Sequence, residues 1–128
     1  NTLPLLVLGG LVLLSGRVTF LVVTIVVTIV AGLGIWLFAP RFQVHIGASS
    51  LVFGYLGFLL LSAWFSRDWR EAVIAVVAGL LYGGLVLTLL RNTPGISWHG
   101  HAFGFLGGIV CAWGLADRDE KKTDIKRV

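Results

Sequence analysis

The chain has very few of the residues on which soluble or disulfide-bonded domains depend. Among its 128 residues there is one cysteine, no methionine, and 12% charged residues against 57% hydrophobic ones. A single cysteine, Cys111, excludes an internal disulfide and a cysteine-rich metal site. The low charge content and a mean hydropathy of +0.94 exclude an ordinary soluble domain and indicate a polytopic α-helical membrane protein. Because even an initiator methionine is absent, we expect the sequence to be part of a longer protein.

Five apolar segments make up most of the chain: residues 1–14, 18–38, 51–65, 72–90 and 101–116. The breaks between them are rich in glycine, proline, serine and charged residues, which interrupt helices. We therefore predict an all-α fold, a bundle of transmembrane helices over residues 1–116. Residues 117–128 are mostly charged and of mixed sign, so we expect a solvated, frayed cytosolic tail there.

Basic residues are divided unequally between the two sides of this bundle. Alternating the segments across the bilayer places the tail on one side together with Arg17, Arg67 and Arg70. Only Arg41 and Arg91 fall on the other side. Positive charge marks the cytoplasm, so we expect a multi-pass protein of the cell membrane with a cytoplasmic C-terminus. The net charge of +4 is thus explained by topology, and no nucleic-acid partner is expected.

Three polar side chains are predicted to lie at one depth inside the membrane. Counted back from the nearest following cytosolic arginine, Ser49 lies 18 residues away, His101 17 and Asn1 16. At 1.5 Å per residue, all three stand about 24–27 Å above the cytosolic border, within about one helical turn of each other. The third and fifth segments have only 15 and 16 residues, so their outer ends stop below the membrane surface.

A serine and a histidine at one submerged depth suggest nucleophilic catalysis. Serine needs a base to accept its proton, and histidine is the usual one. His101 shares a helix face with Gly104 and Gly108, and such glycine spacing lets a neighbouring helix approach closely. That approach would bring the imidazole to Ser49. Phe53, four residues after Ser49, would lie beneath the pair and could pack on the ring.

The other two histidines, His45 and His99, lack this glycine face and are less suitable as the base. A metal site built from His99, His101 and Cys111 is poor because Cys111 lies ten residues, about 15 Å, below His101. No HExxH motif of a zinc protease is present. We therefore expect no metal and no cofactor.

No carboxylate can complete a catalytic triad at this depth. All six acidic residues are predicted on the cytosolic side: Asp68, Glu71, Asp117, Asp119, Glu120 and Asp124. The site is therefore predicted to be a Ser-His dyad. The same absence argues against an aspartyl protease, which needs two buried carboxylates, and against a proton-coupled transporter.

Acyl transfer also requires hydrogen-bond donors for the developing oxyanion. The backbone N–H groups of Ala48 and Ser49, at a predicted helix start, can supply some of them. The side-chain amide of Asn1 is a further candidate donor. The alternative for Asn1 is that it is merely a polar end of the chain.

These residues resemble the rhomboid family of intramembrane serine proteases. Gly47-Ala48-Ser49-Ser50 is similar to the family's G-x-S-G motif, and His101 to Gly108 is similar to its H-x-x-G-x-x-x-G motif. Residues 45–60 and 94–113 look like a bacterial branch. Residues 1–5 resemble the segment whose asparagine closes an H-x-x-x-N motif, which implies that Asn1 helps to bind the oxyanion. Ser50 stands where the family usually has glycine.

The resemblance implies an intramembrane serine endopeptidase that cleaves membrane-anchored protein substrates within the lipid bilayer. It also implies that the five segments are the second to sixth helices of a six-helix core, and that residues 72–90 and the loop after them move to admit substrate. Two alternatives remain: a catalytically inactive rhomboid-like protein that binds transmembrane clients, and a channel or transporter. The oligomeric state has no signal in the sequence.

Overall fold

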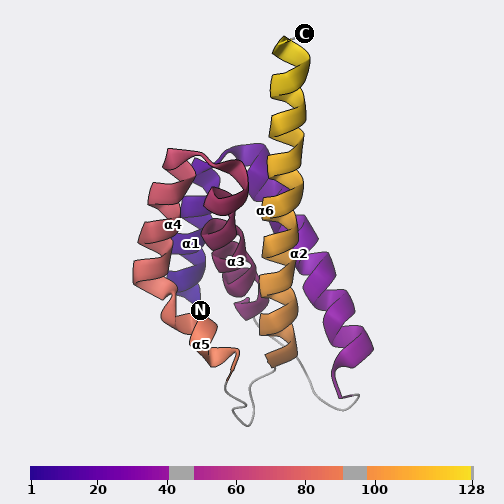
Figure 1. Ribbon diagram of the computed structural model, residues 1–128. Coiled ribbons are helices and arrows are strands. Elements are labelled where there is room, and N and C mark those ends of the chain that lie inside the picture. Colours follow the sequence, from indigo (N-terminus) through magenta and orange to yellow (C-terminus); the bar gives the residue numbers. More distant parts are fainter. Residues whose placement is uncertain (41–47, 91–97, 128) are drawn as a thin grey trace.

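The computed structural model describes residues 1–40, 48–90 and 98–127 (Figure 1). Within these ranges the chain forms six α-helices and no strand, which confirms the predicted all-α bundle. The helices are α1 (Thr2–Leu14), α2 (Arg17–Phe38), α3 (Ser49–Ser66), α4 (Trp69–Tyr82), α5 (Gly84–Thr88) and α6 (Trp98–Arg127).

The fourth predicted span is divided into α4 and α5. The division falls at Gly83, which is followed by Gly84, and glycine is the weakest helix former after proline. After this point the turn tightens, because the N–H of Val86 donates to the carbonyl of Gly83, three residues back, at 3.0 Å. Two adjacent glycines therefore end one helix and begin a short second one.

The fifth predicted span is longer than expected. α6 continues beyond Ala116 as far as Arg127, where the sequence analysis expected a frayed tail. Lys121 and Asp117 form an ion pair of 2.7 Å one turn apart, an arrangement that supports an exposed helix. The charged residues therefore extend α6 past the rest of the bundle (Figure 1).

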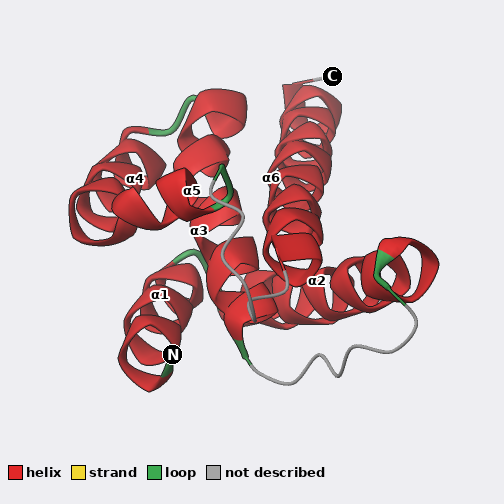
Figure 2. Cartoon of the chain, turned by 90° about the horizontal axis from the view of Figure 1, so that it is seen from below, coloured by secondary structure: helices red, strands yellow, loops and turns green. Residues whose placement is uncertain are grey.

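α3 is the central helix. It packs against α1, α2, α4 and α6, and its pairing with α6 is the most extensive in the bundle. All residues from 52 to 59 are buried, so the middle of α3 is enclosed on every side. Seen from below, α3 lies between α1, α4 and α6 (Figure 2). A site at either end of α3 is consequently built from several helices.

α2 has apolar residues on its buried face and on its exposed face. Its buried residues are Val23, Val27, Ala31 and Gly34. Its exposed stripe repeats every four residues and consists of Leu21, Ile25, Ile29 and Leu33. A helix that is apolar all round is typical of a membrane span. By length and composition, α2 and α3 are the described helices that can cross a membrane, and α1 is a shorter apolar helix.

The corner between α3 and α4 is closed by local polar contacts. α3 ends at Ser66, and its C-cap residue Arg67 has a φ of 55°, in the left-handed region. Asp68 then caps α4, because its carboxylate accepts a hydrogen bond of 2.9 Å from the N–H of Arg70. One turn inside the bundle, the buried hydroxyl of Ser62 donates to Glu71 at 3.0 Å. These contacts join the C-terminal end of α3 to the N-terminal end of α4.

The charged side chains of the described residues lie at one end of the bundle. The α1–α2 connection, next to Arg17, and the α3–α4 corner lie at the end from which α6 extends (Figure 1). The first residues of α3 and α6 lie at the opposite end. Arg41 and Arg91, which were predicted on that opposite side, lie outside the described residues.

Candidate active site

The first turns of α3 and α6 form the end of the bundle that carries the predicted site (Figure 2). Ser49 is the first residue of α3, and Ala48 is its N-cap. The carbonyl of Ala48 accepts a hydrogen bond of 3.1 Å from the N–H of Val52. Ser49 is half-buried, and so is His101 in the first turn of α6. Both side chains thus stand at helix ends rather than in the enclosed middle of the bundle.

Glycines of α6 bring its backbone against the backbone of α3. A Cβ atom on Gly104 would collide with the carbonyl oxygen of Ser50, and one on Gly108 with that of Gly54. Only glycine permits so close an approach between two helices. The predicted glycine stripe therefore lies in the α3–α6 interface, three and seven residues after His101, about one and two helical turns along α6.

The imidazole of His101 lies on the ring of Phe53. The two ring centroids are 4.3 Å apart and the planes are inclined by 17°. Phe53 is only 3% exposed, so its own position is held by the core. Because residues four apart share a helix face, this stacking places the imidazole over the face of α3 on which Ser49 stands.

No hydrogen bond joins the hydroxyl of Ser49 to the imidazole of His101, although both residues are described. The side-chain hydrogen bonds between helices are elsewhere, such as the 3.0 Å bond from Ser62 to Glu71. In ligand-free enzymes, catalytic hydrogen bonds are often long and tighten only when substrate binds. The arrangement is a serine and a histidine on facing helices, aligned by Phe53 but not bonded.

The candidate oxyanion donors are of two kinds. The N–H groups of Ala48 and Ser49 belong to the first turn of α3, where backbone donors have no acceptor within the helix. They also lie at the positive end of the helix dipole. Asn1 precedes α1, and its side chain is exposed and makes no capping hydrogen bond. Within the described chain, no hydrogen bond connects the amide of Asn1 to Ser49 or His101.

The remaining predicted residues are placed as follows. His99 stacks on its neighbour Trp98, with ring centroids 4.5 Å apart, so its imidazole packs against a residue of its own helix. Cys111 is buried farther along α6. The described residues contain no group of three His, Cys, Asp or Glu side chains that could hold a metal ion. His45 and Gly47 lie outside the described residues.

Two contacts in the interior were missed by the sequence analysis. The hydroxyls of Thr24 and Tyr55 are hydrogen-bonded at 2.8 Å between α2 and α3. The side chain of Ser50 lies against Gly100 of α6. The only sequence signal for the first was the presence of hydroxyl residues within apolar segments, which does not identify a partner.

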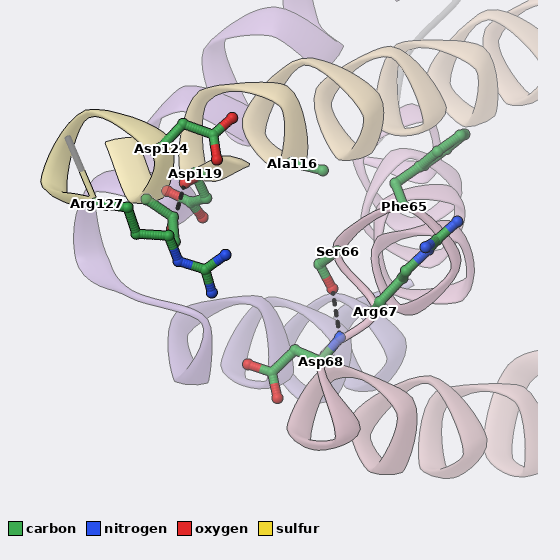
Figure 3. A pocket seen from close by; sticks show the side chains of 9 residues that line it. Phe65, Ser66, Arg67, Asp68, Ala116, Asp119, Asp124 and Arg127 are labelled. Atoms are coloured by element: carbon green, nitrogen blue, oxygen red, sulfur yellow. Dashed lines mark hydrogen bonds between the residues drawn. The ribbon is translucent and has the colours of Figure 1, made fainter. Parts of the chain in front are cut away.

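A groove of about 530 Å³ lies at the opposite end of the bundle, between the α3–α4 corner and the extension of α6 (Figure 3). It is lined by Phe65, Ser66, Arg67, Asp68, Ala116, Asp119, Thr123, Asp124 and Arg127. None of the candidate catalytic residues is among these. The groove therefore lies at the end from which α6 extends and is separate from the serine and histidine.

Comparison with known proteins shows the family to which the sequence belongs. The chain matches the family model of the Rhomboid domain over residues 1–118. Uncharacterized proteins of Mycobacterium bovis and Mycobacterium tuberculosis are each 40% identical over 135 residues, covering 99% of this chain and 56% of theirs. An uncharacterized protein of Mycobacterium leprae is 40% identical over 133 residues, covering 96% of this chain and 51% of its own.

The chain therefore spans about half the length of the curated relatives it matches. No solved structure gives a significant match. The matched region begins at Asn1, includes Ser49 and His101, and ends within α6. On this evidence the chain belongs to the rhomboid family of intramembrane proteases.

Proposed function

We propose that this chain is the core of an intramembrane serine endopeptidase in which Ser49 is the nucleophile and His101 the base. The observation that carries the proposal is the stacking of His101 on Phe53, one helical turn from Ser49. The close contact between the backbones of α3 and α6 at Gly104 holds the two helices in this arrangement. Membership of the rhomboid family supports the same assignment.

In the first half of the reaction, His101 accepts the proton of the Ser49 hydroxyl, and the oxygen attacks the carbonyl carbon of the scissile peptide bond. The N–H groups of Ala48 and Ser49 stabilise the tetrahedral oxyanion, together with the amide of Asn1. His101 then gives its proton to the leaving nitrogen and the C–N bond breaks. In the second half, water attacks the acyl-enzyme, with His101 again as base, and Ser49 is released.

The substrates are membrane-anchored proteins, as family membership implies. The end of the bundle that carries Arg17, Arg67 and Arg70 faces the cytoplasm and the C-terminus lies there, so the cut is made near the outer face of the cell membrane. α4 and α5, which contain most of residues 72–90, move to admit the substrate from the bilayer. Residues 1–116 are the transmembrane domain, and the charged continuation of α6 extends into the cytosol.

The test is cleavage of a membrane-anchored substrate by the full-length protein in liposomes. Ser49→Ala and His101→Ala should each abolish cleavage while leaving expression unchanged. His99→Ala is the matched control, because this histidine is two residues away and stacks on Trp98 instead. Its activity should be retained. Substantial residual proteolysis in either of the first two variants would refute the dyad.

A second function is a rhomboid-like protein that binds transmembrane clients without cutting them. It is favoured by the absence of a Ser49–His101 hydrogen bond and by serine at position 50. A fluorophosphonate probe separates the two functions, because only an activated serine reacts with it. Labelling of Ser49 supports the protease, and a full-length protein that binds clients but is not labelled supports the alternative.

A further inference from the structure

We propose that Ser50 and Gly100 form a matched pair that sets the separation of Ser49 and His101. The two are positioning residues rather than catalytic ones, and the inference rests on the proposed function. It explains how the chain accommodates a serine where the rhomboid family usually has glycine. The pair is adjacent to the reacting residues on both helices, since Ser49 precedes Ser50 and His101 follows Gly100.

The contact at Gly100 differs from the other glycine contacts of α6. A Cβ on Gly104 or Gly108 would meet main-chain atoms of α3, whatever side chains α3 carried. A Cβ on Gly100 would lie 2.9 Å from the side-chain oxygen of Ser50, closer than real Cβ atoms approach. The hydroxyl of Ser50 therefore occupies the volume that a side chain at position 100 would need.

Gly100 is buried, so an added methyl group there has no solvent into which it could turn. The next neighbour, the terminal methyl of Ile35, would lie at 3.3 Å and belongs to a flexible side chain that can shift. The obstruction is consequently the hydroxyl of Ser50. One turn farther along, the backbone contact at Gly104 holds the helices together. The Ser50 hydroxyl ends a short side chain, so an added methyl at position 100 would either turn it to another rotamer or force the first turns of α3 and α6 apart, and the proposal requires the second.

Such a separation is transmitted directly to the reacting atoms. Misplacement of a reacting group by about 1 Å can lower a rate about a hundredfold. Conversely, removing the hydroxymethyl group of Ser50 makes room for a methyl group at position 100. The double variant, with glycine at position 50 of α3 and alanine at position 100 of α6, should therefore preserve the separation of Ser49 and His101.

The experiment compares Gly100→Ala, Ser50→Gly and the double variant in the full-length protein. The readouts are the rate of fluorophosphonate labelling at Ser49 and the kcat and KM for a membrane-anchored substrate. Gly114→Ala is the matched control, because it is the same change on the same helix and its Cβ would have nothing within 4 Å.

Gly100→Ala should lower the labelling rate and kcat about ten- to hundredfold with KM nearly unchanged. The double variant should recover most of the loss, and Gly114→Ala should behave as the parent. Normal labelling of Gly100→Ala would overturn the proposal, as would an equal defect in the double variant. Should Gly100→Ala fail to accumulate, recovery of expression by Ser50→Gly supports the pair, and no recovery overturns it.

A parent protein that is neither labelled nor active would instead contradict the proposed function. The separation of positions 49 and 101 is then measured without catalysis. Cysteines introduced by Ser49→Cys and His101→Cys, in a Cys111→Ala background, are crosslinked with a short bifunctional methanethiosulfonate. Gly100→Ala should lower the crosslinked fraction and Ser50→Gly should restore it. A fraction that is indifferent to both substitutions would overturn the matched pair.

Discussion

The stacking of Phe53 on His101 allows the contribution of one ring to catalysis to be measured. Leucine at position 53 would keep most of the buried apolar volume and remove the aromatic face. Aromatic pairs of this kind contribute about 0.5–1.5 kcal/mol beyond their burial. Since about 1.4 kcal/mol corresponds to a factor of ten, the stacked orientation of the imidazole should become about 2- to 13-fold less populated. We expect Phe53→Leu to lower kcat by the same factor.

The assay is cleavage at saturating substrate by the full-length protein in liposomes. Phe58→Leu is the control, because Phe58 is also 3% exposed on α3 but makes no ring-stacking contact in the described part of the chain. Both substitutions conserve volume approximately and should cost less than about 1.5 kcal/mol of stability. If kcat falls equally in the two variants, or not at all in Phe53→Leu, the ring does not orient His101.

Three further predictions concern stability. Gly108→Ala should destabilise the fold by about 1–3 kcal/mol in detergent unfolding, because its Cβ would meet the α3 backbone, whereas Gly114→Ala should not. Tyr55→Phe should cost about 0.6 kcal/mol, because it removes the 2.8 Å hydrogen bond to Thr24, and a double-mutant cycle with Thr24→Val measures this. Asp68→Ala should cost about 0.5–2 kcal/mol by removing the cap of α4, seen as faster amide exchange in its first turn.

Each of these three stability predictions has an outcome that would contradict it. Equal unfolding of the two glycine variants would mean that α3 and α6 do not touch at Gly108. A zero coupling energy between Tyr55 and Thr24 would mean that their hydrogen bond does not stabilise the fold. Unchanged exchange after Asp68→Ala would mean that the start of α4 is held by packing alone.

The sequence by itself determined the helical character of the chain and the positions of most spans. In lipid, the N–H and C=O groups of a long apolar segment can form hydrogen bonds only with each other. Apolar segments such as that of α2 therefore form helices. The residue count from the arginines that were predicted to be cytosolic placed Ser49 and His101 at one end of the bundle. The i+4 spacing predicted Phe53 beneath them, and its ring stacks on His101 in the structure.

Only the tertiary structure decided how the helices are rotated against one another. A helical period states which residues share a face, but not which face of α6 meets which face of α3, because that depends on packing among residues some fifty positions apart. Hence the contact of Ser50 with Gly100 and the bond of Thr24 to Tyr55 were absent from the sequence analysis. The break at Gly83 and the continuation of α6 to Arg127 were also not predicted, because the pattern of apolar segments does not show where helical hydrogen bonding stops.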